Sequence, residues 1–168
     1  MFKVSHTTLI VISGLIWLGV GCLLLSLGLN FLVASFLKDQ TSAHPLLDLV
    51  APYLGGVEQS ALFLVVVGLL IGYLKCRYIF SKTVQKGVDR ILQLPNPVSI
   101  SQIYTKKYYI LLGSMMVLGF LVKFVALDIR GTVDIIIGAA LINGAMLYFR
   151  RAFYVYQENH RTAKPKLL

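Results

Sequence analysis

Charged residues and cysteines are both scarce in this 168-residue sequence, and each scarcity excludes a class of protein. Charged residues make up 14 % of the chain, against about 25 % in a soluble domain, while 57 % are hydrophobic without glycine being counted. This composition excludes a disordered chain and disfavours a soluble globule. The only cysteines, Cys22 and Cys76, show no C-x-x-C spacing, which excludes a disulfide scaffold. The composition predicts a small multi-span membrane protein.

The motifs of enzymes and metal sites are also missing from the sequence. The three histidines, His6, His44 and His160, are scattered over termini and loops without the spacing of a metal-ligand motif. No nucleophile elbow, phosphate-binding loop or dinucleotide-binding glycine motif is present. We therefore expect no enzyme, no cofactor and no bound metal.

Four long hydrophobic runs dominate what the sequence does contain. A helix needs roughly 20 apolar residues to cross a hydrocarbon core of about 30 Å, and backbone groups in lipid must bond internally, which makes such runs helical. The first run is nearly twice as long as a signal-peptide core, which favours a retained helix over a cleaved signal. The sequence predicts an all-α membrane protein, one integral membrane domain over 1–168, with four transmembrane helices in two hairpins. The spans are expected at about 9–37, 60–80, 108–127 and 133–151, with a basic cytoplasmic tail over 152–168.

The basic residues are unevenly distributed between the segments that join these runs. Thirteen of the 16 fall at the N-terminus, between the second and third runs, and in the C-terminal tail, whereas five of the 7 acidic residues lie on the other side. By the positive-inside rule, both termini are expected in the cytoplasm. We expect a multi-pass protein of the plasma membrane, or inner membrane in a bacterium. Because the cations cluster beside the spans, the net charge of +9 favours contact with the bilayer and its anionic lipids over nucleic-acid binding.

The segment 81–94, between the second and third runs, has the pattern of an amphipathic helix. Its apolar residues recur on one helical face (Val84, Val88, Ile91 and Leu92). A separate stripe is basic (Lys82, Lys86 and Arg90). The pattern predicts a short cytoplasmic helix that lies in the headgroup region, where its basic stripe faces a partner or anionic lipid.

The segment 45–54, in the first outer loop, is apolar for a loop. Pro45 suits the first turn of a helix, and Gly55 and Gly56 follow the segment. We expect a short helix on the outer surface, with a re-entrant loop as the alternative.

Small residues recur at a spacing of seven in the first and fourth runs. They are Gly14, Gly21, Gly28 and Ser35 in the first run, and Gly138, Ala145 and Ala152 in the fourth. The second run contains Gly68 and Gly72. Residues seven apart drift by only about 20° around a helix, so each set shares one face on which another helix can approach closely. We expect these faces to pack helices within one protomer, with a homo-oligomer interface as the alternative.

Polar residues within or beside the spans form a second set of candidates. Asn30 and Asn143 are the only amides inside the spans, and we expect each to bond to a neighbouring helix. Four charged residues surround the turn between the third and fourth spans (Lys123, Asp128, Arg130 and Asp134). Asp134 is expected in the first turn of the fourth span, where a carboxylate stabilises the helix terminus. These residues are interpreted as caps and surface ion pairs, or as a charged vestibule leading to a polar pathway.

Two functions follow from these patterns. The first, slightly favoured, is a small oligomeric transporter or channel-like subunit, because four spans leave little room for a pathway within one protomer. The second is a non-catalytic accessory or assembly protein that docks a partner or anionic lipid through its basic cytoplasmic face.

The distribution of basic residues yields a testable topology. In a variant that lacks Cys22 and Cys76, single cysteines placed at Pro45 and at Asn96 should react with a membrane-impermeant maleimide from opposite sides of the membrane. Labelling of both cysteines from outside intact cells would contradict four spans with both termini inside.

Overall fold

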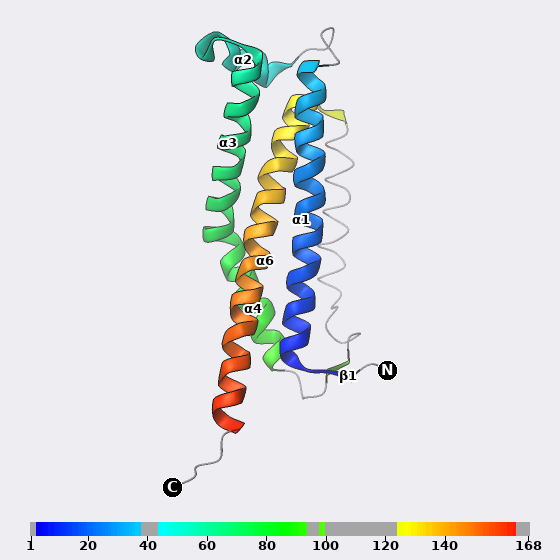
Figure 1. Cartoon of the computed structure of the whole chain (residues 1–168), viewed down its shortest axis with the longest axis vertical. Helices are drawn as coiled ribbons and strands as arrows, with labels where there is room; N and C mark the ends of the chain where they lie inside the picture. Colours follow the sequence, from blue (N-terminus) through cyan, green and yellow to red (C-terminus); the bar gives the residue numbers. More distant parts are fainter. Residues whose placement is uncertain (1–2, 38–43, 94–97, 100–123, 164–168) are drawn as a thin grey trace.

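The computed structural model describes residues 3–37, 44–93, 98–99 and 124–163 (Figure 1). The described α-helices are α1 (His6–Leu37), α2 (Pro45–Leu54), α3 (Val57–Lys75), α4 (Ser81–Leu92) and α6 (Leu127–Ala163). A π-helical turn, η1 (Cys76–Phe80), joins α3 to α4. Two short strands, β1 (Lys3–Val4) and β2 (Val98–Ser99), pair antiparallel with Lys3 opposite Ser99.

Three of the helices are long and apolar enough to cross a membrane. The apolar stretches are His6–Ser35 in α1, Val57–Tyr78 in α3 and η1, and Leu127–Glu158 in α6. They support the prediction of a helical membrane protein. The predicted third span, 108–127, lies almost wholly outside the described residues, as does Lys123.

Helix α6 extends beyond the fourth predicted span, 133–151, at both ends. Helix α6 begins at Leu127, because the Asp128 carboxylate caps its first turn, and Asp134 therefore lies beyond that turn rather than in it. At the other end, α6 continues to Ala163 through residues predicted as the start of a tail. Ala152 is buried and Val155 packs on the same cluster, so tertiary contacts hold this extension of the helix.

Helix α6 lies between α1 and α3 and contacts both (Figure 1). Buried side chains form two clusters, one toward each end of the bundle. At the end that carries α2, side chains from four helices meet (Leu32, Leu47, Ala61, Leu64 and Ile135). At the opposite end, α4 packs on α1 and α6 (Leu9, Ile10, Val84, Val88, Ile91, Tyr148 and Ala152).

The short helix predicted at 45–54 is confirmed as α2, with Pro45 in its first turn and Gly55 at its C-terminus in the left-handed conformation, φ 83°.

From the cluster at the α2 end toward the middle of the bundle, glycines bring the backbones of α1 and α6 into contact. A Cβ atom added to Gly28 would lie 2.7 Å from the carbonyl oxygen of Gly131, and one added to Gly131 would lie 2.8 Å from that of Gly28. A Cβ on Gly138 would lie 2.7 Å from the backbone nitrogen of Leu25. Such distances exclude any side chain, so the glycines are what permits this approach.

The predicted small residues are distributed over the contacts of α6. Gly14, Gly21 and Gly28 face α6 from α1, and Gly68 and Gly72 face it from α3. Ala145 is fully buried, and the hydroxyl of buried Ser35 donates to the Leu32 carbonyl within α1. Gly131 belongs to the same stripe, one repeat before Gly138, but it precedes the predicted start of the span and was therefore missed.

Neighbouring glycines in α1 provide a matched test of this packing. Gly21→Ala should destabilise the protein by about 1–3 kcal/mol, because the new methyl group would lie 3.0 Å from both the Gly138 oxygen and the Ile142 nitrogen. Gly19 has nothing within 4 Å of an added Cβ, so Gly19→Ala should be neutral or stabilising by up to about 1 kcal/mol. The thermal stability of the two variants would be compared by unfolding in detergent. Equal stabilities would contradict the close packing of α1 on α6 at Gly21.

Candidate functional site

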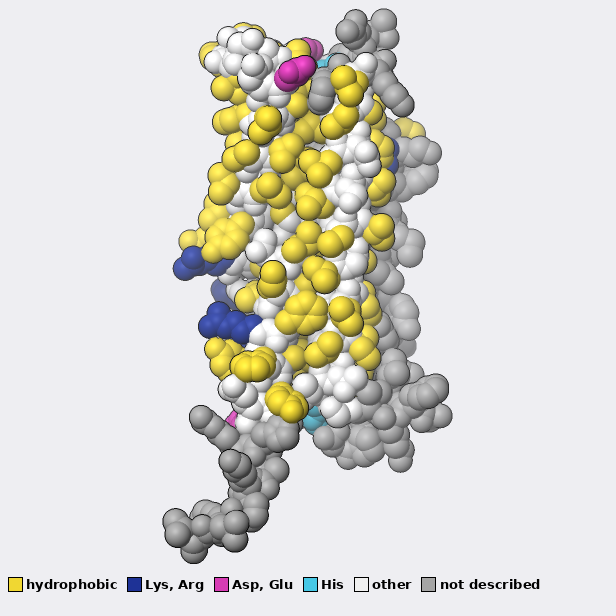
Figure 2. Space-filling view, viewed as in Figure 1, with side chains coloured by type: hydrophobic (Ala, Val, Ile, Leu, Met, Phe, Trp, Pro, Cys, Tyr) yellow, Lys and Arg dark blue, Asp and Glu magenta, His cyan; other side chains and the backbone are white. Residues whose placement is uncertain are grey.

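Most of the described basic side chains gather at the end of the bundle where α3 passes into α4. We call this the basic end, and it comprises Lys75, Arg77, Lys82, Lys86, Arg90, Arg150 and Arg151. All of these side chains are exposed. Figure 2 shows basic side chains along one edge of the molecule, beneath a broad hydrophobic surface. The basic end is therefore the most strongly charged described surface of the chain.

Helix α4 forms as predicted, but its apolar face is covered by protein. Val84, Val88 and Ile91 are buried against α1 and α6, whereas Leu92 is exposed. The periodicity marks an apolar face without showing what covers it, and here α1 and α6 cover most of it. The expected location of α4 in the headgroup region stays a prediction. Gly87 makes the close contact possible, since a Cβ there would lie 2.9 Å from the Tyr148 hydroxyl.

Aromatic rings fix the direction in which α4 leaves α3. The Phe80 ring in η1 meets Trp17 of α1 edge-on, with centroids 5.5 Å apart. Trp17 also contacts Tyr148 of α6 at 5.6 Å. Because α4 is held on its apolar side, the basic stripe of Lys82, Lys86 and Arg90 is left exposed.

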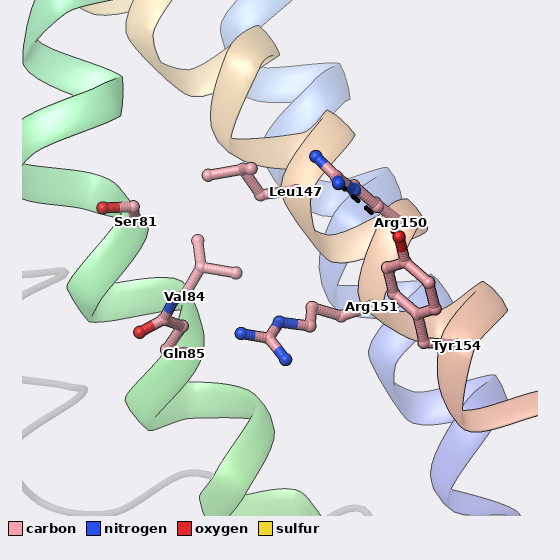
Figure 3. Close-up of a pocket in the computed structure, with 7 residues that line it drawn as sticks. All are labelled: Ser81, Val84, Gln85, Leu147, Arg150, Arg151 and Tyr154. Carbon is pink, nitrogen blue, oxygen red and sulfur yellow. Dashed lines mark hydrogen bonds between the residues drawn. The ribbon is translucent and has the colours of Figure 1, made fainter. Parts of the chain in front are cut away.

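A cleft opens between α4 and α6 at the basic end (Figure 3). It has a volume of about 300 Å³. We call it the α4–α6 cleft, and its lining residues are Ser81, Val84, Gln85, Leu147, Arg150, Arg151 and Tyr154. Sequence reasoning missed this site, because its two walls are far apart in the chain and only the arginine pair at the end of a hydrophobic run was visible.

The polar side chains of the cleft are mostly hydrogen-bond donors. Arg151 extends from α6 toward Gln85 on α4 (Figure 3). The Arg150 guanidinium lies 5.8 Å from the centroid of the Tyr154 ring, and its Nη2 donates to the Tyr154 hydroxyl at 3.5 Å. The Ser81 hydroxyl donates to the carbonyl of Arg77 at 2.7 Å. Among the described lining residues two are arginines and none is a carboxylate, so the lining carries a net positive charge that suits an anion.

At the opposite end, Asp128 anchors α2 rather than facing a vestibule. Its side chain is fully buried, and its Oδ2 accepts hydrogen bonds from the backbone N–H groups of Leu46 at 2.7 Å and Leu47 at 3.3 Å. Its Oδ1 accepts from the N–H of Ile129 at 2.8 Å. One carboxylate thus caps the first turns of both α2 and α6.

The other described residues of the predicted polar pathway lie apart from one another on α1 and α6. Arg130 stacks over the Phe31 ring at 4.1 Å, and Asp134 is half-buried. Asn143 donates to the Ala139 carbonyl of its own helix at 2.8 Å, so the expected bond to a neighbouring helix is wrong for this contact. Asn30 is exposed on α1.

A second hollow, a groove of about 380 Å³ between α1 and α3, is lined by aliphatic side chains and Glu58. Of the pathway residues that the structure describes, none lines this groove or the α4–α6 cleft. Arg130 and Asn143 are also about 20 Å apart along α6 at 1.5 Å per residue.

Comparisons with known proteins add no function to this geometry. No protein-family model, curated protein or solved structure matches the chain. Within the described ranges, no group of three histidine, cysteine, aspartate or glutamate side chains is placed to hold a metal ion.

The double cap by Asp128 can be tested by amide exchange. Asp128→Ala should leave the N–H groups of Leu46 and Leu47 without their acceptor, destabilise this end by about 1–3 kcal/mol and accelerate hydrogen exchange throughout α2. Asp134→Ala, which removes a carboxylate from the same helix, is the control and should leave exchange in α2 unchanged. Equal exchange in the two variants would contradict the anchoring of α2 by Asp128.

Proposed function

We propose that this chain is a non-catalytic membrane accessory protein that binds anionic lipid at its basic end. The observation that carries the proposal is the orientation of α4. Its apolar face is buried on α1 and α6, and its basic stripe consequently faces away from the bundle. Because packing holds the helix that carries this stripe, its backbone loses less freedom on binding than that of a mobile segment would.

The position of the basic end along the spans supports a lipid ligand. Arg150 and Arg151 directly follow the uncharged run 135–149 of α6, and α4 begins soon after the apolar stretch Val57–Tyr78. These residues therefore lie at the level of the headgroups when the spans cross a bilayer. With both termini in the cytoplasm of a plasma or bacterial inner membrane, as we propose, they meet the leaflet that is rich in anionic lipid, where each Lys or Arg contributes about 1 kcal/mol.

Transport by a homo-oligomer is the second candidate. It is supported by Asn30, an exposed amide on a membrane-spanning helix, since a polar group facing lipid favours being covered by another helix. We rank it second, because the described pathway residues are dispersed whereas the basic residues are gathered at one end.

A charge-neutralised variant tests the lipid-binding proposal. Lys82→Gln, Lys86→Gln and Arg90→Gln combined should weaken retention of anionic lipid by up to about 3 kcal/mol at low salt, and less at high salt, because surface charges are screened. Lipid retained by the purified protein, and anionic-lipid enrichment around it in nanodiscs, would be measured.

The matched control removes exposed charge from the α2 end, as Asp48→Asn with Glu58→Gln, and should not weaken retention. Unchanged lipid retention in the triple variant would contradict the proposal. Solute flux through reconstituted wild-type protein that is altered by Asp134→Asn would instead favour transport.

A further inference from the structure

We infer that the α4–α6 cleft is a selective site for the phosphomonoester headgroup of a membrane lipid, bound between Arg150 and Arg151. The inference rests on the proposed function and deepens it. The exposed stripe on α4 attracts any anionic lipid, whereas the cleft selects one chemical class of headgroup.

The charge of the cleft favours a ligand with two negative charges. Two of its seven lining side chains are cationic and none is anionic. The cations are consecutive residues directly after the uncharged run 135–149, where nearby hydrocarbon lowers the effective dielectric constant and strengthens their mutual repulsion. A phosphomonoester carries about −1.5 to −2 near pH 7 and offsets both charges, whereas a phosphodiester carries only about −1.

The donors of the cleft match the oxygens of such a group. Each guanidinium presents five N–H donors in a planar fork that binds phosphate oxygens in pairs. The contact from Arg150 to Tyr154 is long, at 3.5 Å, and occupies a single nitrogen. Arg151 points from α6 across the cleft toward Gln85 (Figure 3). A monoester has three free acceptor oxygens, enough to accept from both guanidinium groups and from a neutral donor at once.

The apolar wall of the cleft favours a lipid over free phosphate. Buried Val84 and half-buried Leu147 line the same space as the arginines. The volume of about 300 Å³ is at the lower end of small-molecule sites and exceeds what a bare phosphate fills. The glycerol carbons of a lipid cover this wall, whereas inorganic phosphate leaves it exposed to water.

Binding of two matched lipids to the full chain tests the inference. Native mass spectrometry in detergent would compare phosphatidic acid with phosphatidylglycerol of the same acyl chains, and inorganic phosphate would be added as a competitor. We expect the monoester to bind about tenfold more tightly than the diester. Its affinity should fall as the pH drops from 7 to 5, because the second phosphate proton binds near pH 6 while arginine stays charged; the diester affinity should not change.

Arg151→Gln is the decisive variant, and Arg77→Gln is its control. Both side chains are exposed at the basic end, but only Arg151 lines the cleft. Arg151→Gln should weaken monoester binding about tenfold and remove the preference over the diester. Arg151→Lys, which keeps the charge without the fork, should recover only part of the affinity. Arg77→Gln should preserve the preference.

Each contrary result has a distinct meaning. Equal affinities for the two lipids, or equal losses in Arg151→Gln and Arg77→Gln, would overturn the selective site and leave general anionic-lipid binding intact. Displacement of the lipid by an equal concentration of inorganic phosphate would overturn the assignment to a lipid. Failure of wild-type protein to bind either lipid would overturn both this inference and the proposed function.

Discussion

The direct contact between the backbones of α1 and α6 is the constraint on which the rest of the structure depends. Gly28 and Gly131 each occupy space that the other's Cβ would need, and Gly138 approaches the backbone of α1 in the same way. In lipid, apolar side chains gain little by leaving the acyl chains, so association depends on close van der Waals packing. Helix α6, which packs on α1 along this line, also packs on α3. In that second contact Gly72 of α3 lies against the carbonyl of Ile136.

The two ends of this central pair are closed by different physical means. At the α2 end, one buried carboxylate, Asp128, satisfies N–H groups at the start of two helices, and Leu47 completes the cluster beneath α2. At the basic end, a π-helical turn and the contact of Phe80 with Trp17 direct α4 onto α1 and α6. Hydrogen bonding thus positions a short apolar helix at one end, and apolar packing positions a charged helix at the other.

Periodicity predicted the helices better than it predicted their surroundings. The spacing of Gly14, Gly21 and Gly28 identified the face that packs on α6, because a repeat of seven is a property of one helix. Helix α6 begins before the predicted fourth span, at Leu127, because the Asp128 carboxylate accepts hydrogen bonds at the start of both α2 and α6. Local patterns do not specify contacts between segments that are far apart in the chain. They therefore show neither what covers the apolar face of α4 nor that Arg151 of α6 lines a cleft with α4.

The helices that carry the basic residues are held in place by packing, which the positive-inside rule alone does not require. The positive-inside rule depends on the number of Lys and Arg residues near the spans, so a mobile basic loop would satisfy it equally well. Here Val84 and Val88 hold α4 on α6, and the extension of α6 through Ala152 continues the helix that carries Arg150 and Arg151. Topology alone requires neither contact. Their joint effect is to place guanidinium groups beside an apolar wall. At the headgroup level that we propose for this end, such an arrangement matches one end of a lipid molecule.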